Sequence, residues 1–158
     1  MAWAKNATST RGSAGELTDV TLTAYKFNMF MNHNIDLSAN NDVIIQFNND
    51  TSTNYADRFE RNGTENTTTN NGDVRLVPSG GAFDSFIIGF YVNLAAEEKL
   101  AIIFSMQDGG AGAANDPDRD FGVGKWTNTS TQITEADITT TSTATLGTSS
   151  NVSFLGSD

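Results

Sequence analysis

The sequence has no cysteine, and only one histidine and two prolines among 158 residues. Disulfides and thiolate metal sites both need the cysteine sulfur, so neither can form. A single imidazole leaves little for a histidine-based active site or for a metal site built from several histidines. The lack of cysteine fits assembly in a reducing cytosol.

Positive charge is also scarce, because 9 Lys and Arg stand against 19 Asp and Glu, for a formal net charge of −10. Nucleic-acid binding depends on basic side chains that neutralise phosphates, so this balance argues against such a partner. No apolar run approaches the ~18 residues of a membrane-spanning helix. The N-terminus also lacks the cationic and apolar segments of a secretory signal. We therefore expect neither nucleic-acid binding nor membrane insertion.

Small neutral polar residues are abundant, with 21 Thr, 17 Asn and 13 Ser. They gather between short runs of β-branched, aromatic and aliphatic residues, which is typical of strands joined by polar turns. We expect strands at residues 17–23, 25–34, 42–48, 74–77, 85–94, 100–106, 121–126, 131–139 and 144–154. The pattern predicts one all-β domain over residues 1–158, a jelly-roll-like antiparallel β-sandwich of about ten short strands with long polar loops.

The most hydrophobic segments are 85–94 and 100–106, and a connection of hairpin length joins them. We expect this pair at the centre of the core. Segment 52–61 is the one candidate for a short helix, and an ordered loop is the alternative. The Thr- and Asn-rich segment 63–72 and the Gly- and Asp-rich segment 108–120 are expected to be loops.

The acidic loop contains Asp116, Asp118 and Asp120 at alternating positions, and these are candidate metal ligands. Alternating carboxylates could supply part of the six to eight oxygens that Ca²⁺ prefers. The spacing is not that of an EF-hand loop, and Arg119 places a cation among the ligands. The alternative is a turn held by Asx hydrogen bonds and an Arg–Asp pair. No other cofactor is expected.

Three aromatic residues are candidates for surface contacts. Tyr55 and Trp126 could stack on sugar rings, although core packing is the alternative for Trp126. Trp3 lies in a small and polar N-terminal segment with little apolar company. We expect it to anchor on another surface, either of its own domain or of a neighbouring subunit.

Three stretches resemble small β-sandwich structural proteins of tailed bacteriophages and their environmental relatives. They are Phe47 to Ala56, Val123 to Thr134, and the ending Ala144 to Gly156. The entry Arg11–Gly15 into the first strand and the closing Leu155–Gly156 also resemble that group. The resemblance implies a jelly-roll-like virion protein, either a head decoration (cement) protein or a fibre or tail-surface module, often trimeric. It implies no catalytic residue.

The function we expect is therefore a non-enzymatic component of the virion surface, assembled in the host cytoplasm and acting through subunit–subunit contacts. Its partners would be other capsid or tail proteins and further copies of itself, with a trimer favoured. In this reading the N-terminal arm, residues 1–15 with Trp3, docks on a neighbouring subunit. The alternative is a lectin-like module that recognises host surface glycans. An enzyme is the weakest hypothesis, because one histidine and no cysteine leave few catalytic groups.

Overall fold

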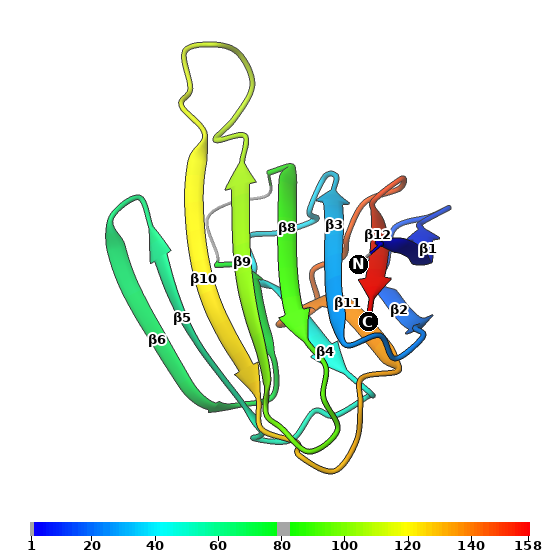
Figure 1. Cartoon of the computed structure of the whole chain (residues 1–158). Coiled ribbons are helices and arrows are strands. Elements are labelled where there is room, and N and C mark those ends of the chain that lie inside the picture. Colours follow the sequence, from blue (N-terminus) through cyan, green and yellow to red (C-terminus); the bar gives the residue numbers. More distant parts are fainter. Residues whose placement is uncertain (1, 79–82) are drawn as a thin grey trace.

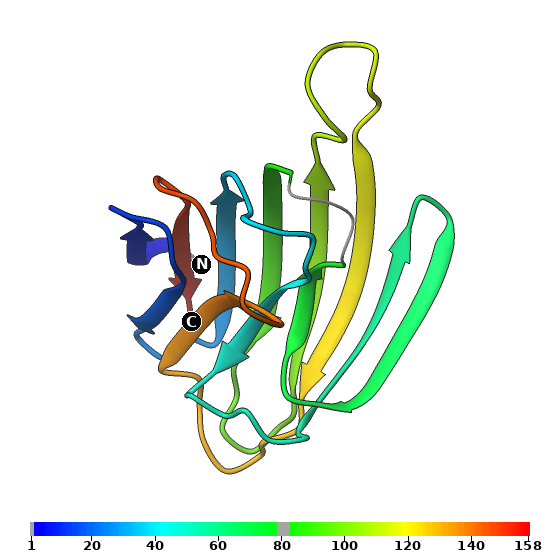
Figure 2. The same ribbon diagram turned by 180° about the vertical axis from the view of Figure 1, so that it is seen from behind.

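The computed structural model describes residues 2–78 and 83–158, which form two antiparallel sheets stacked face to face (Figure 1 and Figure 2). The large sheet has the order β1 (Ala4–Thr10), β12 (Asn151–Ser157), β3 (Phe27–Asn34), β8 (Ser85–Val92), β9 (Lys99–Gln107), β10 (Asp118–Trp126), β5 (Tyr55–Arg61) and β6 (Thr64–Asn71). The small sheet has the order β2 (Leu17–Thr21), β11 (Glu135–Thr140), β4 (Val43–Phe47) and β7 (Val74–Val77). The predicted all-β sandwich is confirmed. Among the described residues, no helix is long and apolar enough to cross a membrane.

Besides β1, two polar segments are strands that the sequence did not predict. Segment 52–61 was expected to be a helix or a loop, but its residues 55–61 form β5. The segment expected as a Thr- and Asn-rich loop forms β6, which pairs with β5 along its length. Asn62 and Gly63 join the two strands with positive φ angles of 48° and 90°, the conformation of a tight hairpin turn. Cross-strand pairing therefore outweighs the low apolar content of β6.

The core lies between the sheets and is dominated at one end by aromatic rings. Tyr55 and Trp126 stack with ring centroids 6.1 Å apart, and Phe47 lies 6.0 Å from Trp126 and 5.3 Å from Tyr91. The Tyr55 hydroxyl accepts a hydrogen bond from the Phe47 backbone N–H at 3.0 Å. The Trp126 indole N–H donates to Asp50 at 2.7 Å. These bonds satisfy the polar ends of the two rings within the core.

The side of the large sheet that faces the core carries several polar residues and several small ones. On β3, the buried residues Asn28, Phe30, Asn32 and Asn34 alternate with less buried ones, three of them apolar and the fourth His33. A Cβ at Gly89 of β8 would lie 2.2 Å from the Phe30 ring, so the glycine provides the space that the ring fills. The segments of β8 and β9 do lie at the centre of the sheet. The prediction that places them at the centre of the core is nevertheless wrong for half of their side chains, which point away from the small sheet.

Candidate functional site

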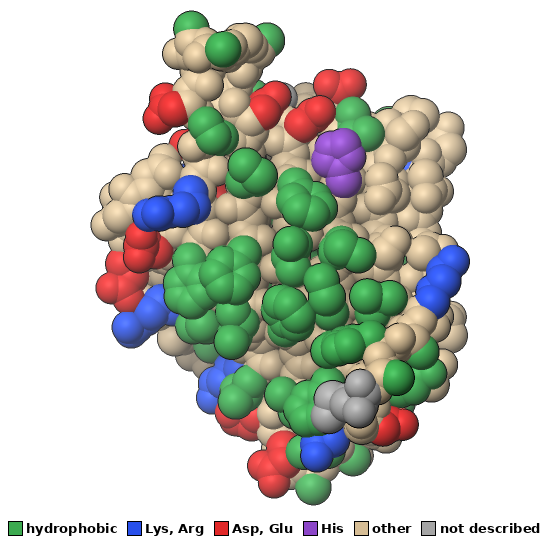
Figure 3. All heavy atoms as spheres, turned by 45° about the horizontal axis from the view of Figure 1, so that its top comes forward, with side chains coloured by type: hydrophobic (Ala, Val, Ile, Leu, Met, Phe, Trp, Pro, Cys, Tyr) green, Lys and Arg blue, Asp and Glu red, His purple; other side chains and the backbone are tan. Residues whose placement is uncertain are grey.

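The outward side of the large sheet carries a continuous apolar surface, which we call the apolar face (Figure 3). It consists of Phe27, Met29 and Met31 of β3, Phe86, Ile88, Phe90 and Val92 of β8, Leu100, Ile102, Phe104 and Met106 of β9, and Phe121 and Val123 of β10. Eight of these side chains are exposed by 39–57%. The surface arises because four adjacent strands each alternate apolar residues outward with residues that point into the sandwich.

The side chains of the apolar face lie in cross-strand rows. One row runs through Met29, Phe90, Ile102 and Val123, and the next runs through Met31, Ile88, Phe104 and Phe121. Phe104 and Phe121 pack with ring centroids 5.1 Å apart. Directly opposed side chains in antiparallel strands support one another, so this surface is preformed and does not depend on loops.

Two hollows lie on either side of Leu100 and Ile102 on β9. The first has a volume of about 480 Å³, and Trp3, Phe27 and Phe90 help to line it. The second has a volume of about 440 Å³ and extends over β10, β5 and β6. Trp3 is 46% exposed, and its position places it at the border of the apolar face. Its expected role in a subunit contact stays a prediction.

Charged side chains at the border of the apolar face are paired with the opposite sign. Lys125 lies 2.9 Å from Glu98, and Arg58 lies 3.0 Å from Glu65. Arg119 lies 3.5 Å from Glu60. These pairs balance one part of the border, whereas Asp84 and Asp108, near Phe86 and Met106, accept backbone hydrogen bonds, and the whole chain carries a net charge of −10.

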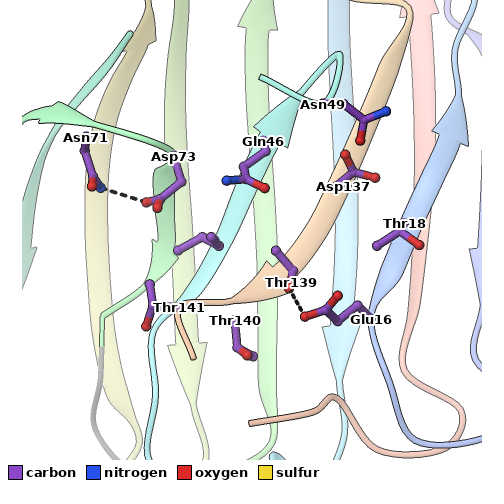
Figure 4. A pocket seen from close by; sticks show the side chains of 11 residues that line it. Glu16, Thr18, Gln46, Asn49, Asn71, Asp73, Asp137, Thr139, Thr140 and Thr141 are labelled. Carbon is purple, nitrogen blue, oxygen red and sulfur yellow. Dashed lines mark hydrogen bonds between the residues drawn. The ribbon is translucent and has the colours of Figure 1, made fainter. Parts of the chain in front are cut away.

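A second concave region, the polar pocket, lies on the outer side of the small sheet (Figure 4). Its volume is about 490 Å³, and carboxylate, amide and hydroxyl side chains dominate its lining. Asp137 is 4% exposed and accepts a hydrogen bond from the Asp19 backbone N–H at 2.6 Å. Thr139 donates to Glu16, and Asn71 donates to Asp73 at 2.9 Å. The arrangement suits recognition of a polar ligand by hydrogen bonds.

Three carboxylates beside this pocket approach one another. Asp19, Glu135 and Asp137 each have an oxygen within 4.8 Å of the others. Burial and the neighbouring carboxylates raise the pKa of Asp137 and of Glu135. The sequence did not single out this group, because its members come from β2 and β11, which are far apart along the chain and neighbours in the sheet.

The acidic residues predicted from the sequence do not form such a group. The ligand atoms of Asp116, Asp118 and Asp120 do not come together at the spacing that a shared ion requires. Instead the Arg61 guanidinium lies 3.4 Å from Asp118 and 3.2 Å from the buried Asp120. Pairing with a cationic side chain is thus the arrangement observed. The partner is Arg61 from β5 and not Arg119.

The two predicted glycan contacts are also wrong. Tyr55 and Trp126 are each 1% exposed and belong to the aromatic cluster of the core. A buried ring cannot stack on a sugar, so core packing, the alternative considered for Trp126, is correct for both.

Two buried carboxyls give the fold a defined pH dependence. Burial, together with the charges of Asp57 and Asp42, raises the pKa of Asp73 from 3.8 to about 6. Burial likewise raises the pKa of Asp120 from 3.8 to about 6, although Arg61 opposes the shift. The protonated form of each carboxyl is more compatible with the folded chain than the charged form. The stabilisation from protonation is fully present below pH 3.8 and is lost as the pH rises through about 6, because the folded chain binds more protons than the unfolded chain in that window. Lowering the pH from about 7 to about 5 should raise the free energy of unfolding by about 1–2 kcal/mol per carboxyl.

Thermal unfolding across this pH range measures the effect. The variant Asp73→Asn should reduce the pH dependence, because it removes one of the carboxyls whose pKa is raised. Below about pH 4 the trend should reverse, since hydrogen bonds from Asn54, Ser52 and Trp126 outweigh burial and lower the pKa of Asp50 to about 2. A Tm that falls steadily from neutral pH to about pH 5 would contradict the assignment.

Comparisons with known proteins identify no family for this chain. No protein-family model and no curated protein matches it. Among solved structures, the infectious bursal disease virus VP2 subviral particle aligns at 11% identity with a TM-score of 0.13, over 98% of this chain and 39% of that chain. A TM-score this low carries no argument about fold or function.

Proposed function

We propose that this chain is a non-enzymatic structural subunit of a virus particle, acting at the virion surface through contacts with other protein subunits. A capsid decoration protein and a fibre or tail-surface module both fit this role. The apolar face is the observation that carries the proposal. The largest apolar patch on a monomeric protein is about 300–600 Å² and often functional, and larger patches mark interaction sites.

The position of the apolar face supports a structural role over a catalytic one. It lies on four adjacent strands of one sheet, and so it is broad and held by the backbone ladder. Enzyme sites are instead concave and combine an apolar lining with a few convergent polar groups. Polar residues of the chain gather elsewhere, in β6, in the loops and in the polar pocket on the other sheet.

Cosedimentation with virus particles tests the proposal. In particles banded by density from cells that produce this chain, we expect its peptides to be recovered with the particles in many copies. The variant Ile102→Lys, which places a charge in the middle of the apolar face, should be absent from the particle fraction. The matched variant Thr143→Lys adds the same charge to an exposed loop after β11, and it should stay with the particles. A chain found wholly apart from the particles contradicts the proposal.

The polar pocket favours a second candidate function, recognition of host surface glycans. Hydrogen-bonding side chains such as Gln46, Asn49 and Asp137 line it, and sugar hydroxyls are bound by groups of this kind. A glycan array compares the unmodified chain with the variant Asp137→Ala. Binding that the variant loses supports this candidate, and an array without signal contradicts it.

A further inference from the structure

We propose that the apolar face is covered by the apolar face of a second copy of this chain. The inference rests on the proposed function and names the partner that the surface takes. The two large sheets would stack with their outward sides together, about 10 Å apart, as sheets do inside a β-sandwich. The small sheet and the polar pocket of each copy would remain on the outside of the assembly.

The size of the apolar face matches what a stable contact needs. Its eight most exposed side chains are Phe86, Phe90, Leu100, Ile102, Phe104, Met106, Phe121 and Val123. Large side chains of this kind have a total area of ~150–250 Å² each. With exposed fractions of 39–57%, the eight together present on the order of 650 Å² to solvent. A standard protein–protein interface buries about 800 Å² per partner. The five partly buried members of the face and Trp3 supply the remainder.

Charge favours a copy of the chain over a basic or acidic partner. The residues of the apolar face include no ionisable side chain, and His33 stands opposite Phe86 at its edge, so the centre of the face offers nothing to a partner of opposite charge. Three ion pairs, Lys125–Glu98, Arg58–Glu65 and Arg119–Glu60, lie along one part of its border, and at another part Asp84 and Asp108 lie near Phe86 and Met106 and accept backbone hydrogen bonds. The centre of the surface therefore places no like charges in contact when two chains of net charge −10 meet, and charges beyond about 8 Å are screened at physiological salt.

The relief of the surface is compatible with self-association. Leu100 and Ile102 form a raised strip between the hollows of about 480 and 440 Å³. A surface with both a ridge and hollows offers each copy the shapes that the other needs, as an isologous contact requires. Trp3 lines one hollow, so the contact would also bury the exposed indole of the N-terminal segment.

Sedimentation velocity of the purified full chain tests the inference. At about 50 µM, where contacts with micromolar dissociation constants are populated, the unmodified chain of 16.9 kDa should sediment as two chains. Ile102→Lys and Phe104→Thr should each raise the dissociation constant at least about 30-fold, as expected for anchors at the centre of an interface. Phe104→Thr keeps a residue suited to a strand, and Thr143→Lys is the control for charge alone.

Each outcome decides the inference. A mass of two chains that both substitutions reduce to one chain supports it, whereas a mass of three chains overturns it, because a face-to-face contact pairs only two sheets. A mass of one chain overturns it, and so does an oligomer that neither substitution weakens. If the chain is monomeric but still joins virus particles in a way that Ile102→Lys abolishes, a different virion protein covers the face. In that case the second-copy inference fails, while the proposed function stands.

Discussion

Replacing Phe30 with alanine should lower the free energy of unfolding by about 3–5 kcal/mol, because the change removes a large buried ring and leaves a cavity. Phe30 is 1% exposed, and its ring centroid lies 5.8 Å from that of Phe154. The ring fills the space left by the missing Cβ of Gly89, which has no side chain that could move into the cavity. Little can collapse into the cavity, so the loss should lie toward the upper end of the range.

The neighbouring residue provides the control. Met31 lies on the same strand one position later and points to the apolar face. Met31→Ala should change the stability of a single chain by no more than about 0.5 kcal/mol, as for surface positions generally. Both substitutions should be measured by urea unfolding in an Ile102→Lys background, so that self-association does not contribute. Equal losses, or a larger loss for Met31→Ala, would mean that the sides of β3 are assigned the wrong way round.

Replacing Asp57 with alanine should lower the free energy of unfolding by roughly 3–5 kcal/mol, because the change leaves a buried guanidinium without its counter-ion. The Asp57 side chain is fully buried and that of Arg75 is 9% exposed. The Arg75 side chain donates to Asp57 Oδ1 at 2.5 Å and 3.1 Å and to Oδ2 at 3.4 Å, and the Arg75 backbone N–H donates to Oδ2 at 3.2 Å. The guanidinium also lies 5.7 Å from the centre of the Phe59 ring.

A double substitution separates the buried charge from the rest of the effect. In Asp57→Ala with Arg75→Met, no unpaired charge remains, so the double variant should be more stable than Asp57→Ala alone. Chemical unfolding of the two single variants and the double variant gives the coupling between the residues. Losses that simply add would contradict the view that the pair acts as one unit.

Much of the fold was predictable from the sequence because most strands combine period-two apolar residues with Asn- and Gly-rich turns. The β5–β6 hairpin was not predictable in this way. Its second strand reads TENTTTNN and owes its structure to pairing with β5 rather than to burial. The strand β1 was missed for the same reason, since its residues are largely exposed and it is held by β12.

The candidate site was the harder part to predict. Alternation identifies the two sides of a strand, but it does not say which side faces the core. On β3 the apolar side carries Met29 and Met31, yet the side that turns inward carries Phe30 among asparagines. The glycines of β8 and β10 were the available signal. Gly89 and Gly122 stand where the Phe30 and Phe59 rings need space, and this marks the inner side.

Methionine oxidation tests most directly whether the apolar face is covered by protein. Besides Met1, the chain has Met29, Met31 and Met106, and all three belong to the apolar face. Peroxide converts accessible methionine to its sulfoxide, which mass spectrometry resolves for each residue. The unmodified chain should oxidise at these residues several-fold more slowly than the Ile102→Lys variant at the same concentration. Equal rates in the two proteins would mean that the face is open to solvent, and would contradict the account.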